Sequence, residues 1–207
     1  MAGGRRPPGR PRLVDLAEPT EVVILRAAAG LFMEHGYRGV TMDMVADAAG
    51  LTKAAVYYHF HDKASLVVAC MQRTFEGARR ATEQLLAQDR PLVERLEEMA
   101  RVVLGLPQPF VAFNILMHEA QTELSPEQVA TLREAEASVT VPLEDEVRRA
   151  LEQGEIDVDD PLLLVHSFVA ALRVGQSVGA DGHPLFPDRQ RTAKVLVSLF
   201  WRGVGPA

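Results

Sequence analysis

Apolar side chains recur every three or four residues along most of the chain, a spacing typical of helices with one buried face. The first such set predicts a helix from about Thr20, which can cap its start, to His35, and Gly36 is expected to end it. Its apolar positions are Ile24, Ala28, Leu31 and Phe32. This first helix is expected to serve as scaffold.

The residues from Thr41 to Lys63 predict a short helix, a tight turn and a second short helix. Thr41 and Thr52 stand where the two helices would start, and a threonine hydroxyl there accepts a hydrogen bond from a free backbone N–H. Gly50 stands at the turn between them. The positions expected to face the core are Met44, Val45, Ala48, Val56 and Phe60.

The open side of the second short helix carries hydroxyls, a lysine and aromatic rings. Its residues are Thr52, Lys53, Ala54, Tyr57, Tyr58 and His59. These groups suit DNA better than catalysis, and the helix-turn-helix motif places its second helix in the major groove. His59, His61 and Asp62 suggest a metal as an alternative, but no complete ligand set stands nearby, so no metal site is expected.

Residues 1–12 form an arm of arginine, proline and glycine, with Arg5, Arg6, Arg10 and Arg12 as its charges. This composition predicts disorder. One hypothesis is that the arginines enter the minor groove or lie along phosphates, and the alternative is a solubilising tail. The piece from Gly9 to Arg12 is similar to part of an AT-hook, although Pro8 stands where an arginine is expected.

Six further helices are predicted after the helix-turn-helix. They run from Asp62 to about Gln88, from Leu92 to about Leu104, over Phe110–Thr122, from Ser125 to about Gln153 with a bend at Pro142, from Asp160 onward, and over Asp188–Arg202. The predicted fold is therefore all-α. The expected domains are a disordered basic arm over 1–19, a helix-turn-helix domain over 20–65, and a helical effector-binding and dimerisation domain over 66–207.

Charge is unevenly distributed along the chain, whose net charge is -6. Residues 1–80 carry 11 Lys and Arg against 8 Asp and Glu, whereas residues 81–207 carry 11 against 20. Only the first part is expected to meet a polyanion. The single cysteine, Cys70, excludes an internal disulfide and favours a cytoplasmic protein, and no apolar run reaches membrane-spanning length.

Enzymatic function is disfavoured by the absence of catalytic motifs. No G-x-S-x-G segment occurs, the six histidines are scattered, and Cys70 lies in a predicted helix without an evident base. The protein is therefore not expected to be an enzyme, and no cofactor is expected.

The pattern A-x-x-A-G-L-T-x-x-x-V-Y-Y-H-F-x-x-K, over Ala46–Lys63, resembles the DNA-binding domain of the TetR family of bacterial transcriptional regulators. The resemblance covers residues 20–70 and implies that five positions contact phosphates or groove edges. These are Thr41, Tyr57, Tyr58, His59 and Lys63. Ala54 and Ala55 depart from the family, because neither hydrogen-bonds a base and only a thymine methyl suits them.

The resemblance also implies a ligand pocket among the middle helices and a dimer formed by the last two helices. The pocket candidates are Met99, Val103, Phe110, Phe113, Asn114, Met117, His118, His166 and Arg173. Arg173 is expected to need an anionic partner. The dimerisation candidates are Phe168, Ala171, Gly175, Gly179, Val195 and Leu199. The alternative for both sets is ordinary core packing within one chain.

The function predicted from these observations is a homodimeric transcriptional repressor that a small hydrophobic ligand releases from a palindromic, double-stranded DNA operator. The alternative is a ligand-independent activator or architectural factor that uses its arginine arm. No membrane partner is expected.

Overall fold

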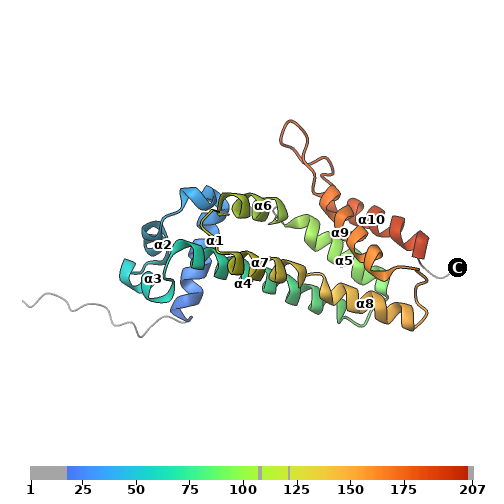
Figure 1. Cartoon of the computed structure of the whole chain (residues 1–207). Coiled ribbons are helices and arrows are strands. Elements are labelled where there is room, and N and C mark those ends of the chain that lie inside the picture. Colours follow the sequence, from blue (N-terminus) through green and yellow to red (C-terminus); the bar gives the residue numbers. More distant parts are fainter. Residues whose placement is uncertain (1–17, 107–108, 121, 205–207) are drawn as a thin grey trace, which may run out of the picture. The chain divides into compact units, whose positions relative to one another are not determined.

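The computed structural model describes residues 18–106, 109–120 and 122–204, with side chains described outside 109–114 and 203–204. Ten helices are found within these residues (Figure 1). They are α1 (Thr20–Gly39), α2 (Met42–Ala49), α3 (Lys53–His59), α4 (Lys63–Leu86), α5 (Leu92–Gly105), α6 (Pro109–Ala120), α7 (Pro126–Ala137), α8 (Val141–Glu152), α9 (Pro161–Gly175) and α10 (Arg189–Val204).

The all-α prediction is confirmed. The only β pairing among the described residues is an isolated bridge between Val178 and Pro184, in the connection from α9 to α10. The chain folds as two compact units, one ending at Val67 and the other beginning at Val68. We call the first unit the head and the second the body.

The head packs α1 against α2 and α2 against α3. Its core contains fully buried side chains from every one of these helices, including Ile24, Val45 and Val56, and Leu66 at the start of α4 is buried with them. Burying such aliphatic side chains stabilises the unit by about 1.5–3 kcal/mol each relative to leaving them in water. These buried side chains fix the face that each short helix turns toward the core.

Local capping signals set the boundaries of the two short helices. The Thr41 hydroxyl oxygen accepts from the Met44 N–H at 3.2 Å, and Thr52 accepts from the Ala55 N–H at 3.2 Å. Gly50 ends α2 with φ 66°, a left-handed conformation that disfavours side chains with a Cβ atom. These three predictions are confirmed.

The start and end of α1 differ from the prediction. Pro19 rather than Thr20 is the N-cap residue, and no side chain caps the helix. The helix also continues to Gly39, with a break at Gly36 where φ is 68° and ψ is 179°. Gly36 thus interrupts the helix as its residue type suggests, but three more residues regain helical backbone and bring the buried Tyr37 ring against Phe32.

The core-facing positions of α2 also differ in part. Ala48 is exposed and Met44 is half-buried, whereas Met42, Val45 and Ala46 are buried. The apolar face is therefore turned toward Met42, which the sequence reasoning left out.

The body is held together by contacts of α10 with α5 and α9, of α9 with α8, and of α5 with α9. The single bent helix predicted over residues 125–153 is instead two helices, α7 and α8, separated at residues 138–140. Pro142 is the reason, since proline has no N–H to continue the helix and is accepted in the first turn of a new one.

One buried ionic cluster joins three helices of the body. The Arg95 guanidinium on α5 donates through Nη1 to the Leu86 carbonyl at the end of α4, and to Glu146 Oε1 on α8 at 2.6 Å. Side chains of Arg95 and Glu146 are only 11% and 6% exposed. Glu146 also pairs with Arg149 through its other oxygen. Arg95 Nε has no hydrogen-bond partner among the described residues.

Candidate nucleic-acid interface and internal cavity

Helix α3 is anchored by one face and exposes the other. Val56 is fully buried and Phe60, the residue after the helix, is 6% exposed, so the two positions four apart hold the helix against α2. Tyr57 and Tyr58 are 43% and 86% exposed, and His59 is exposed beside them with its ring edge-on to Tyr58 at 5.3 Å. Tyr58, the more exposed of the two tyrosines, contributes little to the core of the head.

The start of α3 presents Thr52, Lys53 and Ala54, all exposed, while Ala55 is half-buried. Thr41 stands exposed at the start of α2. Both threonine hydroxyls accept a backbone N–H as caps, so the hydroxyl proton of each is still available to a phosphate oxygen. The predicted DNA-contacting residues of α2 and α3 are thus all solvent-accessible.

Lys53 is held by a residue that the sequence reasoning did not single out. Its Nζ lies 2.7 Å from Asp43 Oδ1 and 3.0 Å from Oδ2, and 5.9 Å from the centre of the Tyr57 ring. The hydrogen bond to Asp43 raises the pKa of Lys53 above its ordinary value, and the negative charge of Asp43 adds to this. The sequence feature that could have indicated this pair is the acidic residue Asp43 in the first turn of α2.

Lys63 is half-buried and already has a partner inside the head. Its ammonium donates to the Tyr37 carbonyl oxygen at 3.0 Å and lies 4.2 Å from the centre of the Tyr37 ring. This contact ties the beginning of α4 to the last turn of α1. A lysine ammonium has three N–H donors, so a phosphate contact remains compatible with this position.

The arm residues Arg5, Arg6, Arg10 and Arg12 lie outside the described residues. Among the residues that are described, no three His, Cys, Asp or Glu side chains gather as a metal site would require.

The body contains a cavity of about 140 Å³. Its lining residues are Met71, Thr74, Phe75, Ala78, Ala81, Thr82, Leu85, Met99, Val102, Val103, Leu106, Val139, Thr140, Leu143, Val169, Leu172, Arg173 and Gln176. They come mainly from α4, α5 and α9, with the junction of α7 and α8 closing one side. The wall is predominantly apolar.

Three of the predicted ligand-contacting residues line this cavity, namely Met99, Val103 and Arg173. Met117 is half-buried, and His118 and His166 are exposed, but none of them belongs to the wall. His166 Nε2 lies 3.9 Å from Glu144 Oε1 on α8. The side chains of Phe110, Phe113 and Asn114 lie outside the described residues.

Arg173 is an exposed residue that also lines the cavity, and its expected need for an anionic partner stays a prediction.

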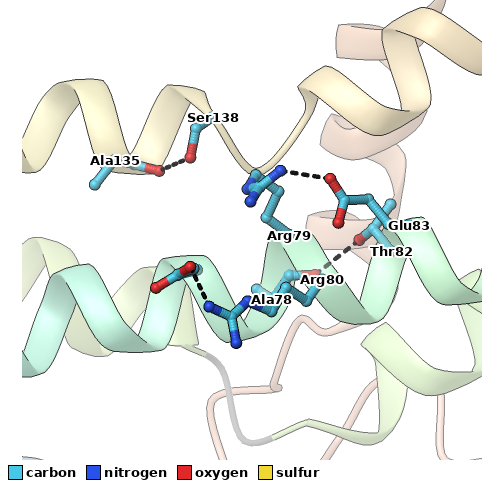
Figure 2. Close-up of polar contacts among 8 residues, drawn as sticks. Ala78, Arg79, Arg80, Thr82, Glu83, Ala135 and Ser138 are labelled. Atoms are coloured by element: carbon cyan, nitrogen blue, oxygen red, sulfur yellow. Dashed lines mark hydrogen bonds and ion pairs between the residues drawn. The ribbon is translucent and has the colours of Figure 1, made fainter.

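Helix α4 contributes more residues to the cavity wall than any other helix, and the sequence analysis did not predict it as part of the ligand pocket. Met71, Phe75, Ala78, Thr82 and Leu85 follow one another at intervals of four and three residues, so they share one helical face. The Thr82 hydroxyl donates to the Ala78 carbonyl at 3.0 Å, as Figure 2 shows. Because its proton is used by the helix backbone, this threonine adds little polarity to the wall.

Two arginines of α4 form ion pairs with glutamates of the same helix. Arg79 pairs with Glu83, and Arg80 pairs with Glu76, each one helical turn away (Figure 2). At the end of α7, the Ser138 hydroxyl donates to the Ala135 carbonyl at 2.7 Å (Figure 2). The apolar face lining the cavity is therefore distinct from the charged residues of the same helix.

The six dimerisation candidates divide by burial. Phe168 is 4% exposed with its ring edge-on to Phe200 at 5.4 Å, and a Cβ atom at Gly175 would lie 2.6 Å from Leu104 Cδ2. Both positions pack within one chain, where α5 and α10 contact α9, and their role in a dimer stays a prediction. Ala171 is half-buried, and Gly179 lies in the loop after α9.

Val195 and Leu199 on α10 are 50% and 64% exposed. Sequence reasoning missed three further exposed apolar residues on α9, namely Leu162, Leu163 and Val174, with exposures of 56%, 63% and 58%. The sequence feature that could have indicated them is the presence of apolar residues on every side of this helix. A helix that buries a single face needs apolar residues on that face only. No helix among the described residues is long and apolar enough to cross a bilayer.

The head has the helix-turn-helix architecture, with an exposed, capped second helix, and it is followed by a helical body with an apolar cavity. Residues 24–70 match the model of the "Bacterial regulatory proteins, tetR family". This match covers most of the head and the beginning of α4, and it indicates a DNA-binding domain of the TetR type over these residues. The homologues of this chain are DNA-binding transcriptional regulators rather than enzymes.

One curated relative is the transcriptional repressor AcnR of Corynebacterium efficiens, 26% identical over 153 residues, which are 73% of this chain and 77% of AcnR. A TetR-family regulator from Mesorhizobium loti shares the fold, with a TM-score of 0.75 at 20% identity over 90% of this chain and 97% of that one. AibR, solved with isovaleryl coenzyme A and operator DNA, has a TM-score of 0.60 at 25% identity over 87% and 97%.

Proposed function

We propose that the protein is a homodimeric transcriptional repressor that leaves its operator when a small hydrophobic ligand occupies the cavity of the body. The observation that carries this proposal is the course of α4. This helix begins at Lys63, within the head, and its residues between Met71 and Leu85 form a wall of the cavity. A change in that wall acts on the helix that continues into the head.

The exposed face of α3 is the proposed groove-reading surface. Tyr57, Tyr58 and His59 extend outward from a helix fixed by Val56, and the capping hydroxyls of Thr41 and Thr52 stand at the helix starts. Hydroxyl and ring N–H groups donate to phosphate oxygens, while residues near the start of the second helix reach base edges. Ala54 offers apolar contact to a thymine methyl, and the arginine arm adds contacts to phosphates or the minor groove.

The cavity supports a small apolar ligand. Its volume of about 140 Å³ is close to that of engineered apolar cavities of about 150 Å³ that stay dry and bind benzene. A larger ligand must push the walls apart, and α4 is one of those walls. The ligand lowers DNA affinity only by the difference in its own affinity between the two arrangements of the protein.

The exposed apolar residues of α9 and α10 support a dimer. Leu163, Val174, Val195 and Leu199 are each at least half exposed in a single chain. Clustered exposed apolar residues mark interfaces in soluble proteins. Two-fold symmetry places one α3 in each of two half-sites about one DNA turn apart, which makes the operator palindromic.

Repression is favoured over activation because AcnR, a relative over most of the chain, is a repressor. AibR, which was solved with both a ligand and operator DNA, supports the binding of both by a protein of this fold. The alternative, a ligand-independent activator or architectural factor, would depend on the arm and leave the cavity without a role. The apolar cavity is the specific observation that favours the ligand-responsive repressor.

The test is fluorescence anisotropy with DNA from upstream of the protein's own gene, against a scrambled duplex, with and without small aromatic probes such as toluene and indole. We expect sequence-specific binding by a dimer that the probes weaken. Ala78→Leu, which fills the cavity wall, should abolish the probe effect, whereas Ala130→Leu on an exposed position of α7 should not. Equal binding to both duplexes would refute the proposed function.

A further inference from the structure

The helix-turn-helix stretch carries little positive charge for a surface that meets a polyanion. From Thr41 to Lys63 only Lys53 and Lys63 are lysine or arginine, against three aspartates at 43, 47 and 62. Lys63 already donates to the Tyr37 carbonyl, and Lys53 is the one lysine of α2 and α3. Affinity for DNA of any sequence comes mainly from cations that neutralise phosphates. The position and pairing of Lys53 therefore decide how much sequence-independent affinity α3 itself supplies.

Lys53 is paired across the turn of the motif. Asp43 lies in the first turn of α2 and Lys53 is the first residue of α3, and the carboxylate holds the ammonium with distances of 2.7 and 3.0 Å to its two oxygens. Both side chains are about equally exposed, at 60% and 59%. The Tyr57 ring lies 5.9 Å from the same ammonium, one turn further along α3.

We propose that Asp43 is a specificity-determining positioning residue, which acts by holding Lys53 beside the start of α3 and away from the phosphates of non-operator DNA. This inference rests on the proposed function of α3 as the groove-reading helix. Residues near the start of such a helix reach base edges, and lysine is a donor to guanine O6 and N7. Asp43 thereby keeps the cation where a base can use it.

The pair disfavours those phosphate contacts that lie beyond the reach of the paired ammonium. A guanine at the start of α3 can be contacted while one bond to Asp43 persists, because an ammonium has three N–H donors. A phosphate contact made by swinging Lys53 outward instead breaks the pair and leaves the Asp43 carboxylate near DNA without its counter-ion. Non-operator complexes, which depend on phosphates, lose more from this than operator complexes do.

The test compares Asp43→Asn with Asp47→Asn, which removes the same charge from an exposed position one turn later on α2. Each full-length variant is titrated into operator and scrambled duplexes at several salt concentrations. We expect Asp43→Asn to bind the scrambled duplex about fivefold more tightly and to steepen the salt dependence by about 0.9, because Lys53 gains one phosphate. Operator binding should change less, so the operator preference falls.

A double-mutant cycle with Lys53→Gln separates positioning from simple charge repulsion. In the Lys53→Gln background, Asp43→Asn should change affinity for the scrambled duplex less than twofold. The inference is overturned if the change persists there, if Asp47→Asn has the same effect as Asp43→Asn, or if Asp43→Asn leaves the salt dependence unaltered. Equal binding of the unmodified protein to both duplexes would instead overturn the proposed function, while the scrambled-duplex arm still tests Asp43.

Discussion

Removing Glu146 alone should destabilise the body far more than removing Glu146 and Arg95 together. Glu146→Leu leaves the Arg95 guanidinium, which is 11% exposed, without the carboxylate 2.6 Å away. Breaking a buried ion pair from one side costs about 3–5 kcal/mol, because the remaining charge is buried and uncompensated. The bond from Arg95 to the Leu86 carbonyl offsets only part of that charge.

The double variant Arg95→Met/Glu146→Leu removes both charges. It loses the hydrogen bond to the Leu86 carbonyl, which costs about 1–3 kcal/mol when the acceptor is left unsatisfied. It also removes the buried Arg95 Nε that lacks a partner, and the desolvation of that group costs a similar amount in the unmodified protein. We therefore expect the double variant to lie within about 1 kcal/mol of the unmodified protein.

Urea denaturation at fixed protein concentration, followed through the fluorescence of Trp201 in the body, measures these differences. In thermal melts, the single Glu146→Leu change should lower Tm by roughly 10 °C, at about 2–4 °C for each kcal/mol. Asp145→Leu on the same helix is the control, since it breaks an exposed pair with Arg148 and should cost under about 1 kcal/mol. The reasoning is refuted if the double variant loses as much stability as Glu146→Leu alone.

Three further outcomes follow from exposure and burial. Tyr58→Ala should weaken operator binding about tenfold yet leave the urea midpoint unchanged, because an 86% exposed ring contributes little to folding; unchanged affinity would exclude Tyr58 from the interface. Leu199→Asp should shift the protein from dimer toward monomer in sedimentation velocity, and an undisturbed dimer would exclude this part of α10. Burial raises the pKa of the Cys70 thiol from 9.0 to about 12, and the nearby positive charge of Arg73 opposes this rise. The thiol of the unfolded state therefore ionises at lower pH than that of the folded state. The free energy of unfolding should consequently fall as the pH rises from about 9 to 12. Urea titrations across that range, with Cys70→Ala as the control, check this sign.

Local signals in the sequence predicted the head well. Thr41, Gly50 and Thr52 act within four residues of themselves, so neighbouring residues alone determine the caps and the turn. The Ser125–Gln128 capping box formed for the same reason. Thr20 did not act as a cap, since Pro19 precedes α1 in an extended conformation and leaves no side-chain hydrogen bond at that end.

Tertiary choices in the body could not be predicted in the same way. Periodicity identifies apolar residues on α9, but it does not say which of them other helices of the same chain cover; Phe168 is covered and Leu163 is not. The α4 wall has a regular apolar spacing, yet only the fold brings α5 and α9 to it. In the head, the pairing of Asp43 with Lys53 depends in the same way on the angle between α2 and α3. The spacing of the two residues in the sequence does not determine that angle.

The course of α4 through both units has a consequence for how the protein is assayed. Thermodynamic linkage is reciprocal, so a molecule that lowers operator affinity tenfold is itself held tenfold less tightly by operator-bound protein. Ligand titrations on DNA-free protein therefore overstate its sensitivity on an occupied promoter. Under the proposed function, protein bound at a promoter responds only at a higher ligand concentration than free protein does.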